Sequence, residues 1–122
     1  MKISPIFTIL LAALLLGLAA AFAAEPPSRK SADVVFKRIG EHSLKLDIYL
    51  PEQGATHSPL VVWIHGGGWR AGNKEGVPIL PFVASGFAVA SVEYRLSGQA
   101  PFPAQIEDVN AAIRWLRAQA HE

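Results

Sequence analysis

The stretch LVVWIHGGGW, at residues 60–69, joins a five-residue apolar run to three consecutive glycines. The run at residues 60–64 predicts a buried strand, because the side chains on both of its faces are apolar. Glycine loses more backbone entropy on folding than any other residue, so three in a row need a local reason. Two reasons fit: close approach of a ligand to backbone N–H groups, or φ and ψ values that a Cβ atom forbids. Both predict a turn that stabilises an anion.

Upstream of this stretch, two segments predict an antiparallel hairpin at the edge of a sheet. Residues 34–39 and 44–50 have the composition of strands, and the second alternates apolar and polar side chains, which predicts a half-buried strand. The four residues at 40–43 are polar and include glycine, which favours a tight connection between the two strands. The folded part of the chain is therefore expected to begin with this hairpin.

Downstream, the pattern changes to that of a parallel sheet covered by helices. A second apolar run at residues 87–92 predicts a parallel neighbour for residues 60–64, so both runs are expected in the middle of the sheet. Residues 77–85, followed by Gly86, predict the crossover helix that parallel strands require. A longer helix is predicted to begin at Pro103. Its apolar stripe consists of Ile106, Val109, Ala112, Ile113, Trp115 and Leu116. The fold class is α/β.

The first residues have the features of an export signal. Lys2 precedes an apolar run at residues 3–24, and Ala21-Phe22-Ala23 has the spacing of small residues at a signal-peptidase site. An uncleaved membrane anchor is the alternative, because about 20 apolar residues can span a bilayer. The polar segment at residues 25–30 favours cleavage near Ala23 and export to the periplasm or the medium. The predicted organisation is a signal peptide at 1–23, a linker at 24–32 and a folded portion at 33–122.

Charge and composition exclude several classes of function. Removal of Lys2 leaves 10 basic side chains against 10 acidic ones, so no electrostatic case for nucleic acid or a membrane surface remains. The absence of cysteine excludes a disulfide framework, a thiol nucleophile and a lipid-modified N-terminus. The histidines at 42, 57 and 121 lack the spacing of metal ligands, and we expect neither a metal nor a cofactor. The sequence does not determine the oligomeric state.

Three segments resemble the α/β-hydrolases, in the esterase and lipase branch that carries an HGGGW motif. They are residues 61–69, residues 92–96, and residues 102–109 running into Ala112 and Trp115. Their order matches what that family places on its third strand, its fourth strand and the helix that follows. Within the branch, the chain is similar to bacterial esterases that remove acyl or feruloyl groups from plant polysaccharides. The resemblance implies a secreted serine carboxylic-ester hydrolase, acting on a small-molecule or polysaccharide-linked ester.

The resemblance also implies roles for individual residues. In ester hydrolysis the carbonyl oxygen becomes an oxyanion that preorganised donors must meet, and the N–H groups of Gly67 and Gly68 would be two of them. The family's histidine base and its acid both follow the nucleophile in the chain, so neither His65 nor Asp108 matches those roles. The supporting residues would be His65, Gly66 and Trp69, with Tyr94, Arg95 and Asp108 in structural roles. A salt bridge or hydrogen bond between Asp108 and the Tyr94-Arg95 segment is expected.

The family's nucleophile has no match in this sequence. A nucleophile elbow needs G-x-S-x-G, and no serine of the chain has glycines at both flanking positions. The sequence ends at Glu122, on the helix that would precede the elbow, whereas one domain of this fold runs to about 200 to 250 residues. We therefore expect an N-terminal fragment that lacks nucleophile, acid and base and is inactive alone. The strand at 60–64 would then keep an open apolar edge.

Two other functions remain open from the sequence. Residues 66–71 satisfy G-x-G-x-x-A behind an apolar strand, and Glu93 ends the next strand where a ribose-binding acid would lie in a dinucleotide-binding module. That motif must open directly into a helix, for which Gly72, Gly76 and Pro78 are poorly suited. The other alternative is an exported, non-catalytic binding protein that retains part of a hydrolase sheet.

Overall fold

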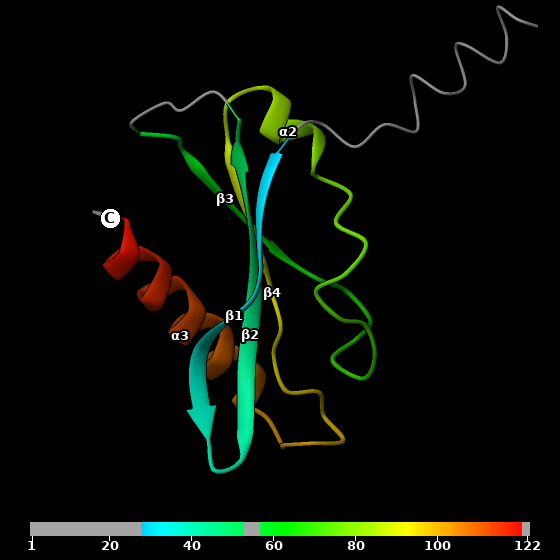
Figure 1. Ribbon diagram of the computed structural model, residues 1–122. Coiled ribbons are helices and arrows are strands. Elements are labelled where there is room, and N and C mark those ends of the chain that lie inside the picture. The colour runs from blue at the N-terminus through cyan, green and yellow to red at the C-terminus, as the bar shows by residue number, and fades with distance from the viewer. Residues whose placement is uncertain (1–27, 53–56, 121–122) are drawn as a thin grey trace, which may run out of the picture.

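The computed structural model describes residues 28–52 and 57–120, which form a mixed sheet with helices on both faces (Figure 1). In chain order the elements are β1 (Ser28–Ile39), β2 (His42–Pro51), β3 (Leu60–Ile64), α2 (Pro81–Ala84), β4 (Ala88–Val92) and α3 (Ala104–Gln119). The strand order is β1-β2-β4-β3, with β3 and β4 parallel and the other pairs antiparallel. The predicted α/β class, with an antiparallel hairpin ahead of parallel strands, is confirmed.

The hairpin of β1 and β2 begins earlier than the sequence predicted. Residues 28–32 were expected in a linker, but they pair with β2 in the register Ser28 to Pro51. The side chains at residues 28–31 are all polar. They therefore lack the alternation of apolar and polar residues that predicts a strand. A register shift between Ser31 and Val34 leaves Asp33 with a φ of 57°. The predicted signal peptide, and the linker residues before Ser28, lie outside the described residues.

The sheet has an apolar core on each face. The core under α3 consists of Phe36, Leu44, Leu46, Ala90, Val92, Ala112 and Leu116. The core on the face of α2 consists of Tyr49, Val77, Val83 and Val89. Because β2 contributes to both cores and also buries Asp47, the prediction of a half-buried strand is wrong.

The crossover between β3 and β4 contains less helix than expected. A helix was predicted over residues 77–85, whereas α2 covers only Pro81–Ala84 and is preceded by turns. Pro78 and Pro81 lack backbone N–H groups, so a continuous ladder of helical hydrogen bonds cannot form across them. The turns place Val77 and Val83 in the same core, which covers this face of the sheet.

Helix α3 begins directly after Pro103, as predicted, but its buried face is more polar than the apolar stripe suggested. Gln105 and Asp108 are buried, whereas Ile106 is 41% exposed. Val109, Ala112 and Leu116 face the sheet as expected. The helix is therefore oriented by a polar contact of Asp108 as well as by its apolar residues.

Strand β3 forms an edge of the sheet in the part of the chain that the structure describes. All five residues of β4 are buried, but Leu60 and Ile64 of β3 are 43% and 38% exposed. The prediction of a place in the middle of the sheet therefore holds for β4, whereas among the described residues β3 has the open apolar edge that was predicted for a fragment. Among the described residues, no helix is long and apolar enough to cross a membrane.

Candidate functional site

The glycine segment that follows β3 forms a tight turn of left-handed residues. The φ angles are 117° at Gly67, 61° at Gly68 and 63° at Trp69. A Cβ atom on Gly67 would collide with the backbone carbonyl of Ala71, so glycine is required there for space as well as for conformation. The turn is closed by the Gly67 carbonyl, which accepts from the N–H groups of Arg70 and Ala71 at 3.1 and 3.2 Å.

The same turn leaves several backbone donors without a partner among the described residues, including the N–H groups of Gly67 and Gly68. Residues 66–70 are exposed, and no backbone carbonyl among the described residues accepts a hydrogen bond from the N–H of Gly67 or Gly68. Unpaired backbone N–H groups at consecutive left-handed residues form an anion-binding concavity. The two predicted oxyanion donors are therefore available to an external acceptor.

His65 and Tyr94 hold the start of this turn. Their rings stack with centroids 4.3 Å apart, and the Tyr94 hydroxyl donates to the His65 carbonyl oxygen at 2.7 Å. His65 Nδ1 lies 2.8 Å from the Gly66 carbonyl oxygen, and because a carbonyl only accepts, Nδ1 donates there. His65 Nε2 is buried without a protein partner among the described residues. The contacts of the His65 ring thus hold the backbone at the start of the turn.

The far side of the turn is fixed by Trp69 and Gly72. The Trp69 ring meets Tyr94 edge-on at 5.2 Å, and the Trp69 carbonyl accepts from the Ser97 N–H at 2.7 Å. Trp69 remains 43% exposed, so it can also contact a ligand bound at the glycines. Gly72, with a φ of 98°, packs so closely that a Cβ atom would collide with His65 Nδ1 and the Gly66 carbonyl.

Asp108 of α3 is fully buried and joins the helix to the segment after β4. The Arg95 guanidinium donates to both carboxylate oxygens, at 2.7 Å from Nε and 2.8 Å from Nη2, and the Arg95 N–H adds a third bond. Lys37 of β1 contributes a fourth contact at 3.0 Å. Asp108 is therefore placed against Arg95, while the neighbouring Tyr94 contacts His65 instead.

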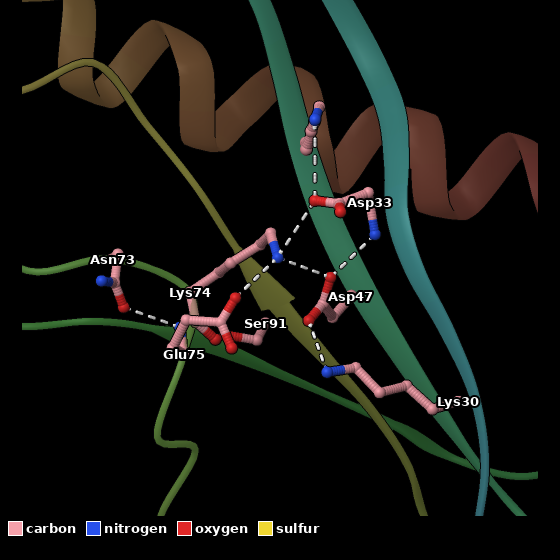
Figure 2. Close-up of polar contacts among 8 residues, drawn as sticks. Lys30, Asp33, Asp47, Asn73, Lys74, Glu75 and Ser91 are labelled. Carbon is pink, nitrogen blue, oxygen red and sulfur yellow. Dashed lines mark hydrogen bonds and ion pairs between the residues drawn. The ribbon is translucent and has the colours of Figure 1, made fainter.

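A second buried carboxylate, Asp47 of β2, was missed by the sequence analysis. Lys74 Nζ lies 2.9 Å from its Oδ1, and Lys30 Nζ lies 3.0 Å from its Oδ2 (Figure 2). The Asp33 N–H donates to Oδ1 at 2.9 Å, a bond that the left-handed Asp33 at the bulge of β1 makes possible. Lys74 is only 6% exposed although it belongs to the loop after the glycine turn. Nothing in the local sequence marked this contact, because 27 positions separate the two residues.

Burial and ion pairing act in opposite directions on both carboxylates. Burial disfavours the charged form of Asp47, but the hydrogen bonds from Lys74, Asp33 and Lys30 outweigh it and hold the pKa of Asp47 below its ordinary value. The pKa of Asp108 is lowered in the same way, because the bonds from Arg95 and Lys37 outweigh burial. Burial would lower the pKa of Lys74, yet its contacts with Asp47 and Glu75 raise that pKa well above its ordinary value.

The surroundings of the turn include a pocket, and among the described residues they hold no cluster of metal ligands. A pocket of about 250 Å³ is lined by residues 42–44 of the hairpin, Gly72, residues 93–96 and Gln99. Residues 28–52 and 57–120 contain no group of three or more metal-ligating side chains. Turns, and no helix, occupy residues 65–80. The helix that a dinucleotide-binding motif requires directly after its glycines is thus missing from this segment.

Comparison with protein families and curated sequences identifies relatives. Residues 46–122 match the BD-FAE family. Carboxylesterase NlhH of Mycobacterium tuberculosis is 36% identical over 86 residues, which are 68% of this chain and 27% of that protein. Arylesterase of Saccharolobus solfataricus is 32% identical over 99 residues, which are 79% of this chain and 32% of that protein. The chain thus spans about a third or less of these relatives.

Solved structures with the same fold include several esterases. A bifunctional GH43-CE protein of Bacteroides eggerthii is 41% identical with a TM-score of 0.65, covering 75% of this chain and 12% of that one. A bacterial heroin esterase is 30% identical with a TM-score of 0.64, covering 88% of this chain and 36% of that one. The sheet, its crossover and α3 therefore correspond to part of a larger esterase domain.

Proposed function

The chain belongs to the BD-FAE family of α/β-hydrolase esterases, and from that premise we propose that it supplies the oxyanion-stabilising part of a serine carboxylic-ester hydrolase. The observation that carries the proposal is the turn after β3, where Gly67 and Gly68 are exposed and their N–H groups have no hydrogen-bond partner in the part of the chain that the structure describes. Carboxylesterases and arylesterases among the relatives support ester chemistry.

In this proposal the two N–H groups bind the oxygen that becomes negatively charged when a nucleophile attacks the ester carbonyl. Their direction is set before the substrate arrives, because the turn is fixed by the contacts of His65, Tyr94 and Trp69. Preorganised donors need no rearrangement as charge develops, and each is typically worth about 2.7 to 4 kcal/mol in the transition state. Gly66 and Trp69 complete the turn without taking part in proton transfer.

The nucleophile, acid and base of the proposed reaction belong to sequence beyond this chain. No serine of the chain lies in G-x-S-x-G, and the chain covers only 27% of the length of carboxylesterase NlhH. We therefore propose that the 122-residue chain is inactive alone. An acyl group on a carbohydrate is the proposed class of substrate, supported by the similarity to the bifunctional GH43-CE protein.

The test begins with the coding DNA beyond the codon for Glu122. We expect a G-x-S-x-G sequence, then an acid and a histidine in that order. The protein encoded through that histidine should hydrolyse p-nitrophenyl acetate with saturable kinetics, and replacing the serine by alanine should abolish turnover. The 122-residue chain assayed in parallel should stay at the buffer rate. A confirmed stop codon after Glu122 would favour a non-catalytic binding protein. Saturable turnover by the 122-residue chain alone would contradict the proposal that it lacks a nucleophile.

Export is part of the proposal. The apolar run at residues 3–24 and the small residues at 21 and 23 support a cleaved signal peptide. The mass of the protein recovered from the periplasm or medium should correspond to a chain that begins near Ala24. A protein that stays with the membrane and keeps Met1 would support the uncleaved anchor instead.

A further inference from the structure

We propose that Lys74 is a positioning residue that, through its ion pair with Asp47, holds the loop after the glycine turn in the geometry that presents the Gly67 and Gly68 N–H groups. The proposal concerns how the chain builds that turn, and its relevance to catalysis rests on the proposed function. Lys74 touches neither the turn nor any substrate, so it acts only through the backbone of its own loop.

The placement of Lys74 shows that it is not an ordinary loop lysine. Its side chain is 7% exposed, although the loop carries exposed neighbours on both sides, and its ammonium group is surrounded by three carboxylates. Asp47 lies at 2.9 Å, Glu75 at 3.1 Å and Asp33 at 3.3 Å (Figure 2). A lysine is rarely buried unless it is paired, so the loop is held where this cluster can form.

The backbone of Lys74 is held as well as its side chain. The Ser91 hydroxyl, which is buried in β4, donates to the Lys74 carbonyl oxygen at 2.7 Å. Lys74 is thereby attached to β4 through its carbonyl and to β2 through its ammonium group. Two neighbouring strands of the sheet fix the position of one loop residue.

A short physical path leads from Lys74 to the glycine turn. Gly72, two residues earlier, packs against His65 Nδ1 and the Gly66 carbonyl oxygen so closely that no Cβ atom fits. Any shift of the loop at Lys74 therefore moves Gly72 against the two groups that precede the oxyanion donors. Gly66 and Gly72 are exposed, so the coupling rests on this one close contact and not on a filled interior.

The test is hydrogen–deuterium exchange, read by mass spectrometry on the 122-residue chain at low micromolar concentration. Lys74→Met keeps the unbranched shape and most of the length of the side chain and removes the charge. We expect at least a tenfold faster exchange at the protected amides of residues 65–72, which are those of Arg70 and Ala71 bonded to the Gly67 carbonyl oxygen, with peptides from α3 changed less than twofold. Lys74→Arg keeps the positive charge and should restore most of the protection. Equal acceleration in all peptides would mean a general loss of stability and would overturn the positioning role.

Two further variants keep the proposal testable if Lys74→Met does not fold. Ser91→Ala removes only the bond to the Lys74 carbonyl, and it should accelerate exchange at residues 65–72 about threefold or more. Lys45→Met is the matched control, because Lys45 belongs to the outer part of the same cluster at 3.7 Å from Asp33. It should leave residues 65–72 unchanged. Unchanged exchange there in Ser91→Ala, or an equal effect of Lys45→Met, would contradict the proposal.

These outcomes separate the positioning role from the function of the site. Exchange reports the order of the turn in the chain itself, whereas the ester assignment is tested by the DNA beyond Glu122 and by turnover. Unaffected exchange would contradict the positioning role of Lys74 and would leave the proposed esterase function unchanged. A protein without esterase activity would contradict the proposed function, whereas the ion pair of Lys74 and Asp47 would still order the loop.

Discussion

Asp47 and Asp108 are two fully buried carboxylates that hold the two loops at the same end of the sheet. Asp108 fixes the segment after β4 through Arg95, and Asp47 fixes the loop after β3 through Lys74. The partners differ in exposure, because the Arg95 side chain is 19% exposed and the Lys74 side chain only 7%. Similar ion pairs can therefore differ in the free-energy penalty for breaking them, since that penalty depends on which charge is left buried.

The largest expected effect comes from removing each carboxylate in turn. Asp47→Asn should lower the free energy of unfolding by about 3–5 kcal/mol, because the buried Lys74 then loses its one buried counter-charge and keeps only the exposed Asp33 and Glu75. Asp108→Asn should lower it by about 1.5–3 kcal/mol, because Arg95 and Lys37 can turn toward water. Urea unfolding followed by tryptophan fluorescence measures both. An effect of Asp108→Asn that exceeds that of Asp47→Asn would contradict the comparison.

The next effect is a loss of stability in acid. Both carboxylates have a lowered pKa in the folded chain, so their contribution is present above the unfolded value of about 3.9 and is lost as the pH falls through the folded pKa. The raised pKa of Lys74 means that its contribution persists up to about pH 10 and is lost only above it. The contribution of these pairs should therefore be constant from pH 5 to pH 9.

Thermal unfolding between pH 2 and pH 9 tests this pattern. The wild-type Tm should fall below about pH 4, and the fall should be shallower in Asp47→Asn and in Asp108→Asn, since each variant lacks one of the groups that titrate. An identical fall of Tm with decreasing pH in all three proteins would show that other groups control acid unfolding.

The smallest effect is expected at the outer cations of the two pairs. Lys30 and Lys37 contact Asp47 and Asp108 at 3.0 Å, but their side chains are 41% and 31% exposed. Partly exposed ion pairs contribute about 0–1 kcal/mol, so Lys30→Met and Lys37→Met should each change the unfolding free energy by less than about 1 kcal/mol. The same urea titration measures this change, and a larger loss for either variant would show that the outer cation is essential to its pair.

The difference between the pairs also explains what could be predicted from the sequence. Asp108 was identified because its helix and the Tyr94-Arg95 segment resemble a known family pattern. Asp47 was missed because an alternating strand assigns its polar positions to solvent, and no local pattern connects it with a lysine in a distant loop. Tertiary burial of a polar strand face is not encoded within the strand itself.

The remaining differences have similar causes. The apolar stripe of α3 predicted a buried Ile106, but the contact of Asp108 with Arg95 turns the helix so that Ile106 is exposed. The crossover helix was overestimated, since Pro78 and Pro81 restrict it to one turn. The antiparallel hairpin and the parallel pair of strands were predicted correctly, because short apolar runs and the hairpin signal determine them locally. The pairing of β2 with β4 was not predicted.

The central claim is that the glycine turn presents oxyanion donors, and a pair of glycine variants tests it most directly. Gly68 and Gly76 have φ angles of 61° and 63°, and a Cβ atom on either meets no atom within 4 Å. Alanine should therefore strain the backbone equally at both positions, while only Gly68→Ala places a methyl group at the proposed donors.

The measurement is kcat for p-nitrophenyl acetate in the protein encoded through the downstream serine and histidine. Gly68→Ala keeps the backbone N–H, but its methyl group should displace the oxyanion from the donors and lower kcat about 100-fold, an effect as large as that of losing one oxyanion donor. The kcat of Gly76→Ala should stay within about threefold of the parent value, which corresponds to a change of about 0.6 kcal/mol in the activation free energy. Equal kcat values for the two variants would contradict the assignment of the turn as the oxyanion site.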